Sequence, residues 1–153
     1  MRDTLLVIHI IAVAAWLGAN LTMAYAGSAN AGAEAVTRRW WAALQGNLGR
    51  VYKSVAAVIV LISGVVLVLD NEGLSMGSTF VSIGFAAIII GILLGIFLYG
   101  PGCRQIASAI DEGDEAQEKS ANNKLAVVGG IETLILVVTI VAMIGEWGLR
   151  APS

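Results

Sequence analysis

The amino-acid sequence predicts an all-α membrane protein, built as a bundle of four transmembrane helices. Of its 153 residues, 58% are hydrophobic and only 13% are charged, whereas a soluble domain is about half apolar and a quarter charged. Four apolar stretches are each long enough to cross the roughly 30 Å hydrocarbon layer at 1.5 Å per residue. They show no alternation with a period of two, so helices rather than barrel strands are expected to satisfy the backbone in lipid. The predicted spans are Thr4–Gly27, Tyr52–Leu69, Thr79–Gly100 and Leu125–Trp147.

The connections between the spans are short, so residues 1–153 are expected to form one transmembrane domain. The first span ends with a small-residue pattern, Ala24-Tyr-Ala before Gly27, that imitates a signal-peptide cleavage site. Its apolar region is longer than the roughly 7–15 residues of a signal peptide, and Asp3 offsets the single basic residue at its start. We therefore expect the first span to be retained.

The basic residues predict the orientation of the bundle. Seven of them lie in or beside two connections: Arg38, Arg39, Arg50, Lys53, Arg104, Lys119 and Lys124. Only Arg2 and Arg150 lie on the opposite side. By the positive-inside rule, the two basic connections face the cytoplasm and both termini lie outside.

Small residues recur at spacings typical of helix packing. Gly84, Gly91 and Gly95 lie on the third span, and a Ser63-Gly64 step lies near the middle of the second. Such residues let helices approach closely, which predicts a tight bundle with faces suited to self-association or to packing in a larger membrane complex. Further examples are Ala12, Ala15, Ala19, Gly129 and Thr133.

The two basic connections carry different predicted structures. In the first, Trp40 and Trp41 follow two arginines, which indicates a short interfacial helix with its rings at headgroup level. In the other, Pro101 predicts a helix break, and Cys103 is expected in that turn as a small packing residue. The acidic segment 111–118 is interpreted as a solvated connector, because its spacing does not match a calcium-binding loop.

His9, the only histidine, lies inside the first span. On a helix it shares one face with Trp16, Asn20 and Gly27, so this polar stripe should face the bundle interior or a partner chain. In a functional interpretation, His9 holds haem b or copper about 7–8 Å below the outer surface, and Trp16 packs against the cofactor. In the alternative interpretation, His9 is neutral and bonds a neighbouring carbonyl group or outer water.

A single histidine limits how a metal could be held. Ligation by two histidines would require a dimer, so a site within one chain is either five-coordinate or uses a methionine. Met23 lies toward the opposite side of the membrane, whereas Met143 matches His9 in depth. Met143 therefore fits better than Met23 as a second ligand, and a five-coordinate site or a dimer site remains the alternative.

Glu132 is the other ionisable candidate inside the membrane, about 12 Å from the cytoplasmic end of the fourth span. A carboxyl group in that setting should be protonated or paired. By depth, its candidate partners are Asn20, Lys53 and Thr133. A proton relay and a bundle-lining carboxyl group are the two interpretations, and direct contact with His9 is not expected.

Several functions are disfavoured by the sequence. One histidine allows no Ser/His/Asp set, and no glycine-rich phosphate loop follows a strand. No concentrated basic face suggests binding to nucleic acid. The sequence thus favours binding or accessory roles over catalysis.

The segment from His9 to Gly18 resembles the first span of a group of small bacterial membrane proteins. The group comprises the copper-resistance D family, the HemJ-type protoporphyrinogen oxidases and the DUF2269 integral membrane proteins. The shared pattern is a histidine, six mostly apolar residues, a tryptophan and a small residue. The likeness to DUF2269 extends over most of the chain and includes Ser63-Gly64 and Met143.

The resemblance implies a bacterial inner-membrane location and haem b or copper bound at His9. This chain departs from the HemJ-type pattern after Trp16, where a Pro-Arg pair and a second histidine are missing, and its third span has no lysine. Most of the extra copper-binding residues of the copper-resistance D family are also missing. Protoporphyrinogen oxidase activity is therefore not expected.

The leading hypothesis is a four-helix membrane protein that binds haem b or copper through His9. A second hypothesis is an accessory subunit that packs through its glycine faces against a larger complex. A third is a small transporter that uses Glu132.

Overall fold

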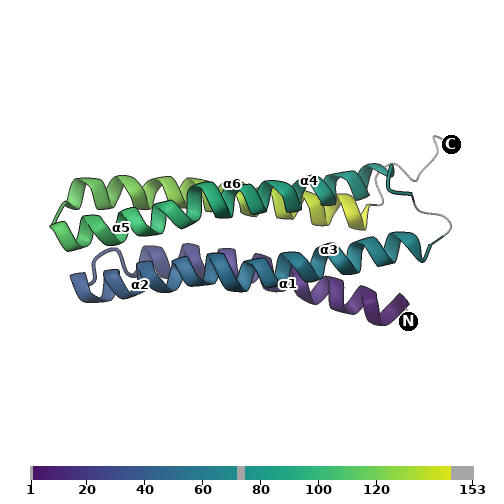
Figure 1. The fold of residues 1–153 in the computed structure, drawn as a ribbon, viewed down its shortest axis with the longest axis horizontal. Coiled ribbons are helices and arrows are strands. Elements are labelled where there is room, and N and C mark those ends of the chain that lie inside the picture. Colours follow the sequence, from purple (N-terminus) through teal and green to yellow (C-terminus); the bar gives the residue numbers. More distant parts are fainter. Residues whose placement is uncertain (1, 72–74, 146–153) are drawn as a thin grey trace.

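The computed structural model describes residues 2–71 and 75–145, and these form a long bundle of helices (Figure 1). In chain order, the elements are α1 (Arg2–Ala29), α2 (Ala35–Asn47), η1 (Leu48–Tyr52), α3 (Lys53–Leu69), α4 (Thr79–Leu94), η2 (Gly95–Tyr99), α5 (Gly100–Glu112) and α6 (Glu115–Ile144). No strand occurs in the described ranges. The predicted fold class is confirmed.

The elements join into four continuous helices, each long and apolar enough to cross a membrane. α1 and the continuous helix α2–η1–α3 form a first hairpin, residues 2–69, and α4–η2–α5 with α6 form a second, residues 79–144. The start of α1 and the end of α6 lie at the same end of the bundle (Figure 1). We call that half the outer half, after the predicted orientation, and the half that contains α2 and α5 the inner half.

The connections predicted between the first and second spans (28–51) and between the third and fourth (101–124) are largely helical rather than loops. The second membrane helix begins at Ala35 and the third ends at Glu112. The chain reverses at the inner end only around residues 30–34 and at Gly113, which adopts a left-handed backbone (φ 72°). These segments are less apolar than the spans, but α2 and α5 bury one face each against other helices, which stabilises helical structure beyond the lipid. At the outer end of the fourth span, Trp147 lies outside the described residues.

Three local predictions in these segments are also corrected. The predicted short helix with Trp40 and Trp41 is instead the start of a longer helix that continues into α3, and Trp41 is buried whereas Trp40 is exposed. Pro101 does not end its helix: it lies in the first turn of α5, directly after the π-helical turn η2. A wider turn at this point accommodates the missing proline N–H. Cys103 accordingly lies buried within α5 rather than in a turn.

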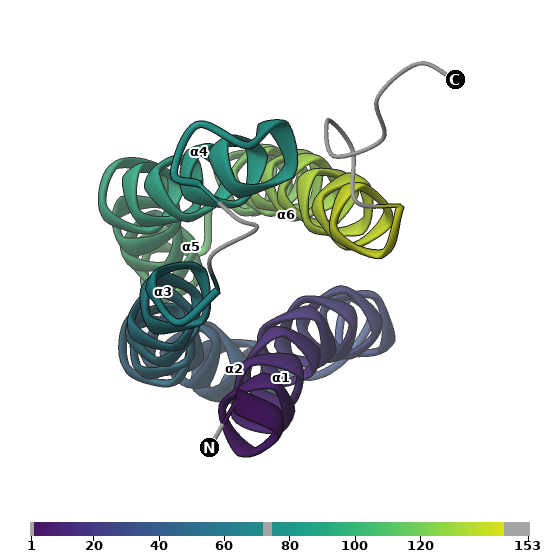
Figure 2. The same ribbon diagram turned by 90° about the vertical axis from the view of Figure 1, so that its right-hand side faces the viewer.

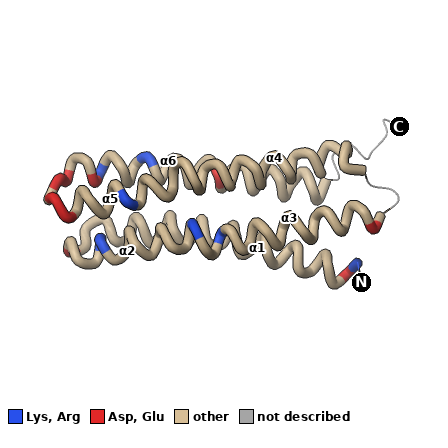
Figure 3. Tube along the Cα trace, in the orientation of Figure 1, with Lys and Arg blue, Asp and Glu red and all other residues tan. Residues whose placement is uncertain are grey.

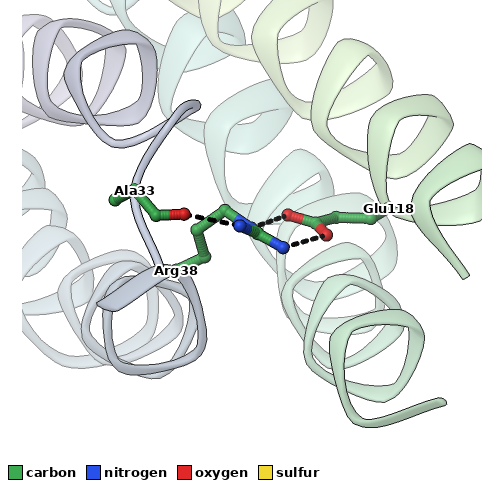
Figure 4. A network of polar contacts seen from close by, with 3 residues as sticks. All are labelled: Ala33, Arg38 and Glu118. Atoms are coloured by element: carbon green, nitrogen blue, oxygen red, sulfur yellow. Dashed lines mark hydrogen bonds and ion pairs between the residues drawn. The ribbon is translucent and has the colours of Figure 1, made fainter. Parts of the chain in front are cut away.

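Complementary charge links the hairpins. The first hairpin has five basic and two acidic side chains, whereas the second has three basic and six acidic, and most of the charge gathers at the inner end (Figure 3). Each ion pair found in the described ranges joins a cation of the first hairpin to an anion of the second. Arg38 bonds both carboxylate oxygens of Glu118 and also donates to the Ala33 carbonyl (Figure 4).

The two halves contain different cores. The inner core is a cluster of buried side chains from all four long helices: Met23, Trp41, Ala42, Tyr99, Cys103, Ile106, Ala121 and Leu125. The second cluster lies toward the outer half and consists of Ala12, Trp16, Ala56, Ala57, Val60, Ile88 and Leu136. Seen along the bundle axis, α1 and α3 lie on one side, and α4 and α6 on the other (Figure 2).

Of the three glycines predicted to mediate packing on the third span, two receive side chains from other helices. A Cβ atom at Gly91 would lie 2.5 Å from the Trp16 ring, which is too close for any rigid aromatic neighbour, so this position requires glycine. One at Gly84 would lie 2.6 Å from the Met143 methyl group, the flexible end of a side chain that can shift. A Cβ atom at Gly95 would have no neighbour within 4 Å, which gives no support to a role of that residue in packing.

Candidate functional site

The candidate site is a cavity of about 280 Å³ between the two hairpins in the outer half, which we call the outer cavity. α1, α3, α4 and α6 all contribute to its wall, which is mostly apolar. Three of the residues predicted for the site, His9, Trp16 and Met143, line it. Its aromatic and polar lining further includes Phe80, Phe85, Thr139 and, toward the start of α1, Arg2 and Asp3.

His9 is held on the cavity wall by α3. Its Nδ1 lies 2.9 Å from Oγ of Ser63, and that hydroxyl group donates to the carbonyl oxygen of Ile59 at 2.5 Å. Because the single hydroxyl proton is used there, Ser63 accepts from His9, and this network assigns the proton to Nδ1. Gly64 makes room for the ring, since a Cβ atom there would lie 3.2 Å from Cε1 of His9. In the neutral ring, Nε2 therefore carries no proton and its lone pair is free.

At the deep end of the outer cavity, Trp16 is tied to a buried ion pair. Its indole N–H donates to Oε1 of Glu132 at 2.8 Å, and Lys53 donates to the other carboxylate oxygen at 2.5 Å. Glu132 and Lys53 are only 2% and 6% exposed. Trp16 and Glu132 lie at similar depth, about 21 Å and about 18 Å from the outer ends of α1 and α6. Glu132 is thus paired, which is one of the two predicted states.

The π-helical turns place the cation of this pair. Lys53 directly follows η1, and Tyr99 is the last residue of η2. The Lys53 ammonium group lies 4.6 Å from the centre of the Tyr99 ring, so an aromatic face covers its other side. Such turns often occur at functional sites because they change the direction of the side chains that follow.

Other predicted residues are not part of these contacts. Asn20 is buried, but it does not line the outer cavity, and neither atom of its side-chain amide has a hydrogen-bond partner. Thr133 donates to the carbonyl oxygen of Gly129 rather than to Glu132. Met23 belongs to the inner core, as its predicted depth implies.

Sequence reasoning missed two contacts of the site. The sequence presents Ser63 only as a small packing residue, and Trp16 only as a residue that packs on a cofactor. A hydroxyl group in the second span at the approximate depth of His9 is the signal that could have identified the first contact. The indole N–H at the depth of Glu132 could have identified the second, because a buried indole usually finds an acceptor.

The outer cavity offers one good ligand atom for a metal-containing cofactor. A metal-binding histidine typically donates its other N–H to a fixed acceptor, and His9 does so to Ser63. No group of three or more His, Cys, Asp or Glu side chains that could hold a metal ion is found among the described residues. The volume of the cavity lies just below the usual 300–1,000 Å³ of ligand pockets.

Comparison with known proteins found no matching family model, curated protein or solved structure.

Proposed function

We propose that this protein binds a membrane-soluble ligand in the outer cavity and that Nε2 of His9 is its polar contact. The observation that carries the proposal is the Ser63–His9 hydrogen bond on the wall of that cavity. It fixes the ring and its proton, and it leaves a lone pair for a ligand atom. A binding pocket combines a mostly apolar wall with a few fixed polar groups, and the outer cavity has both.

Haem b is the first cofactor to test, because the likeness of the first span points to it. His9 would hold its iron, and Met143 lines the same cavity. Copper is a weaker candidate, because a histidine and a thioether make a sparse donor set. In either case the chain's own contribution is to orient the imidazole and to keep water out.

The proposal places the protein in a bacterial inner membrane, with both termini outside. The outer cavity would then open toward the external side, within reach of lipophilic molecules in the outer leaflet. The four long apolar helices support a multi-pass membrane protein. Assembly into an oligomer or a larger complex is compatible with this role.

The test is to purify the protein in detergent and to extract it with organic solvent. Mass spectrometry should detect a bound lipophilic compound in the wild type that His9→Ala lacks. In parallel, titration with hemin should give a red-shifted Soret band that His9→Ala abolishes, if haem is the cofactor.

Thr139→Val is the matched control, because Thr139 lines the same cavity but its hydroxyl group already donates to the Ile135 carbonyl. It should retain the ligand. Equal amounts of every extracted compound, and equal hemin binding, in the wild type and in His9→Ala would refute a role for His9.

A further inference from the structure

We propose that the ligand of the outer cavity is a hydroxyl-bearing lipid with a single apolar chain: its hydroxyl group donates to Nε2 of His9, and its chain extends inward to Trp16. This inference rests on the proposed function and names the ligand class. Two observations independent of any family likeness carry it, namely the proton position on His9 and the shape of the cavity.

The proton position determines which polar group fits. Because Nδ1 of His9 donates to Ser63, Nε2 is an acceptor. An ester or ketone oxygen can only accept, so it would face the lone pair with no proton between them. An alcohol, phenol or quinol supplies the missing proton. In an apolar wall, a ligand without a donor leaves Nε2 of His9 unpaired. The site should therefore discriminate strongly in favour of alcohols, phenols and quinols over esters and ketones.

The shape of the cavity favours a slender molecule. Its lining residues extend along α1 from Arg2 to Trp16, about 20 Å, and along α3 from Val60 to Val68, about 12 Å. The lining thus follows the helix axes over a length that suits an extended chain lying along α1.

The depth of the two contacts sets the length of the chain. His9 and Trp16 are separated by seven residues on α1, or about 10 Å along the helix axis. Between them, the cavity wall is formed by small and aliphatic side chains, among them Val13, Val60 and Gly64. At the deep end the indole ring is fixed by Glu132 and seated over Gly91. A medium-length chain therefore spans the distance from the hydroxyl contact to the Trp16 ring.

Trp16 makes the proposal testable by fluorescence in the full-length protein. In a Trp40→Phe, Trp41→Phe, Trp147→Phe background, Trp16 is the only tryptophan, and bromine at the end of a bound chain quenches it. A medium-chain ω-bromoalkanol is compared with its methyl ether, which has the same chain and no donor. We expect the alcohol to reach half-maximal quenching at about tenfold lower concentration, the value of one hydrogen bond.

Three variants separate the possible outcomes. His9→Phe should remove the preference for the alcohol, Ser63→Ala should reduce it by releasing the imidazole proton, and Thr139→Val should keep it. A circular dichroism spectrum and a single gel-filtration peak establish that each variant is folded.

Equal quenching by alcohol and ether in the wild type, or an undiminished preference in His9→Phe, would overturn the proposal. If neither compound quenches Trp16 while hemin still binds through His9, this ligand class is wrong and the proposed function stands. If both quench alike in wild type and in His9→Phe, the cavity binds chains without His9, and the contact assigned to His9 fails in both proposals.

Discussion

In the inner half of the bundle the two hairpins meet through a continuous core, in which Met23, Trp41 and Leu125 are buried. In the outer half the same two hairpins enclose a cavity. The boundary between the halves is formed by Lys53, Glu132 and Tyr99, where the two π-helical turns end. The comparison shows that the most buried of the ion pairs described between the hairpins, Lys53–Glu132, lies where the apolar packing changes, and that the space for a ligand begins beyond it.

The difference also explains why the protein keeps a buried ion pair at all. Removing two charges from water costs several kcal/mol each, and a membrane interior raises that cost. An apolar pair would hold the hairpins together at least as well. The ion pair does something that an apolar pair cannot do, because it fixes the Trp16 ring at the deep end of the outer cavity through a hydrogen bond.

Loss of one charge at the boundary should have the largest effect on stability. Lys53→Met leaves the Glu132 carboxylate buried with only Trp16 as a partner, which should cost about 3–5 kcal/mol of unfolding free energy. The measurement is unfolding in mixed micelles with increasing denaturing detergent, followed by circular dichroism. The double variant Lys53→Met/Glu132→Leu should recover most of the loss.

Arg39→Ala is the control for this prediction, because its ion pair with Asp111 lies in the inner half and is largely exposed, with 44% and 56% side-chain exposure. It should cost less than about 1 kcal/mol. A loss for Lys53→Met as small as that of Arg39→Ala would show that the ion pair at the boundary contributes no more than a surface pair.

A smaller loss of stability is expected when a methyl group is added at Gly91, against which the Trp16 ring packs. In Gly91→Ala the new methyl group would lie 2.5 Å from Cζ2 of Trp16, so the ring must move. Such overpacking typically costs about 1–3 kcal/mol. The same unfolding assay measures it, and the Trp16 emission maximum reports the displacement.

Gly18→Ala is the matched control, since no atom lies within 4 Å of a Cβ position there. It should be neutral or stabilise the helix by about 0.5–1 kcal/mol. Identical stabilities of Gly91→Ala and Gly18→Ala would indicate that the Trp16 ring can move away from Gly91 at no cost. The deep end of the outer cavity would then not be fixed.

The smallest predicted effect is a gain in stability, which we expect from substitution of Asn20. Asn20 is 3% exposed, and both of its amide atoms are without a hydrogen-bond partner. Replacing this amide by an apolar side chain of similar size, as in Asn20→Leu, should raise the unfolding free energy by about 1 kcal/mol or more. The assay is again detergent unfolding. A loss of stability would instead mean that the amide is hydrated, and the inner half would then be less dry than its apolar core indicates.

Sequence reasoning predicted the features that depend on composition and on helical period. Continuous apolar runs indicated four helices, and the shared face of His9 and Trp16 placed both inside the bundle. Depth alone named Lys53 among the candidate partners of Glu132. It did not predict that helices continue through residues 35–47 and 103–112, because those segments are stabilised by burial of one face against another helix. Hydropathy detects transfer into lipid and not such packing.

The sequence by itself determined that this chain is a four-helix membrane protein with few polar groups inside, because lipid admits only helices of sufficient apolar length. Only the tertiary structure decided which polar groups meet. His9 and Ser63 are 54 positions apart, and Trp16 and Glu132 are 116 apart. The first pairing depends on how α1 and α3 pack against each other within the first hairpin, and the second on how the two hairpins meet. No local sequence pattern specifies either arrangement. The same packing left the outer cavity between the hairpins, and that cavity gives His9 its proposed function.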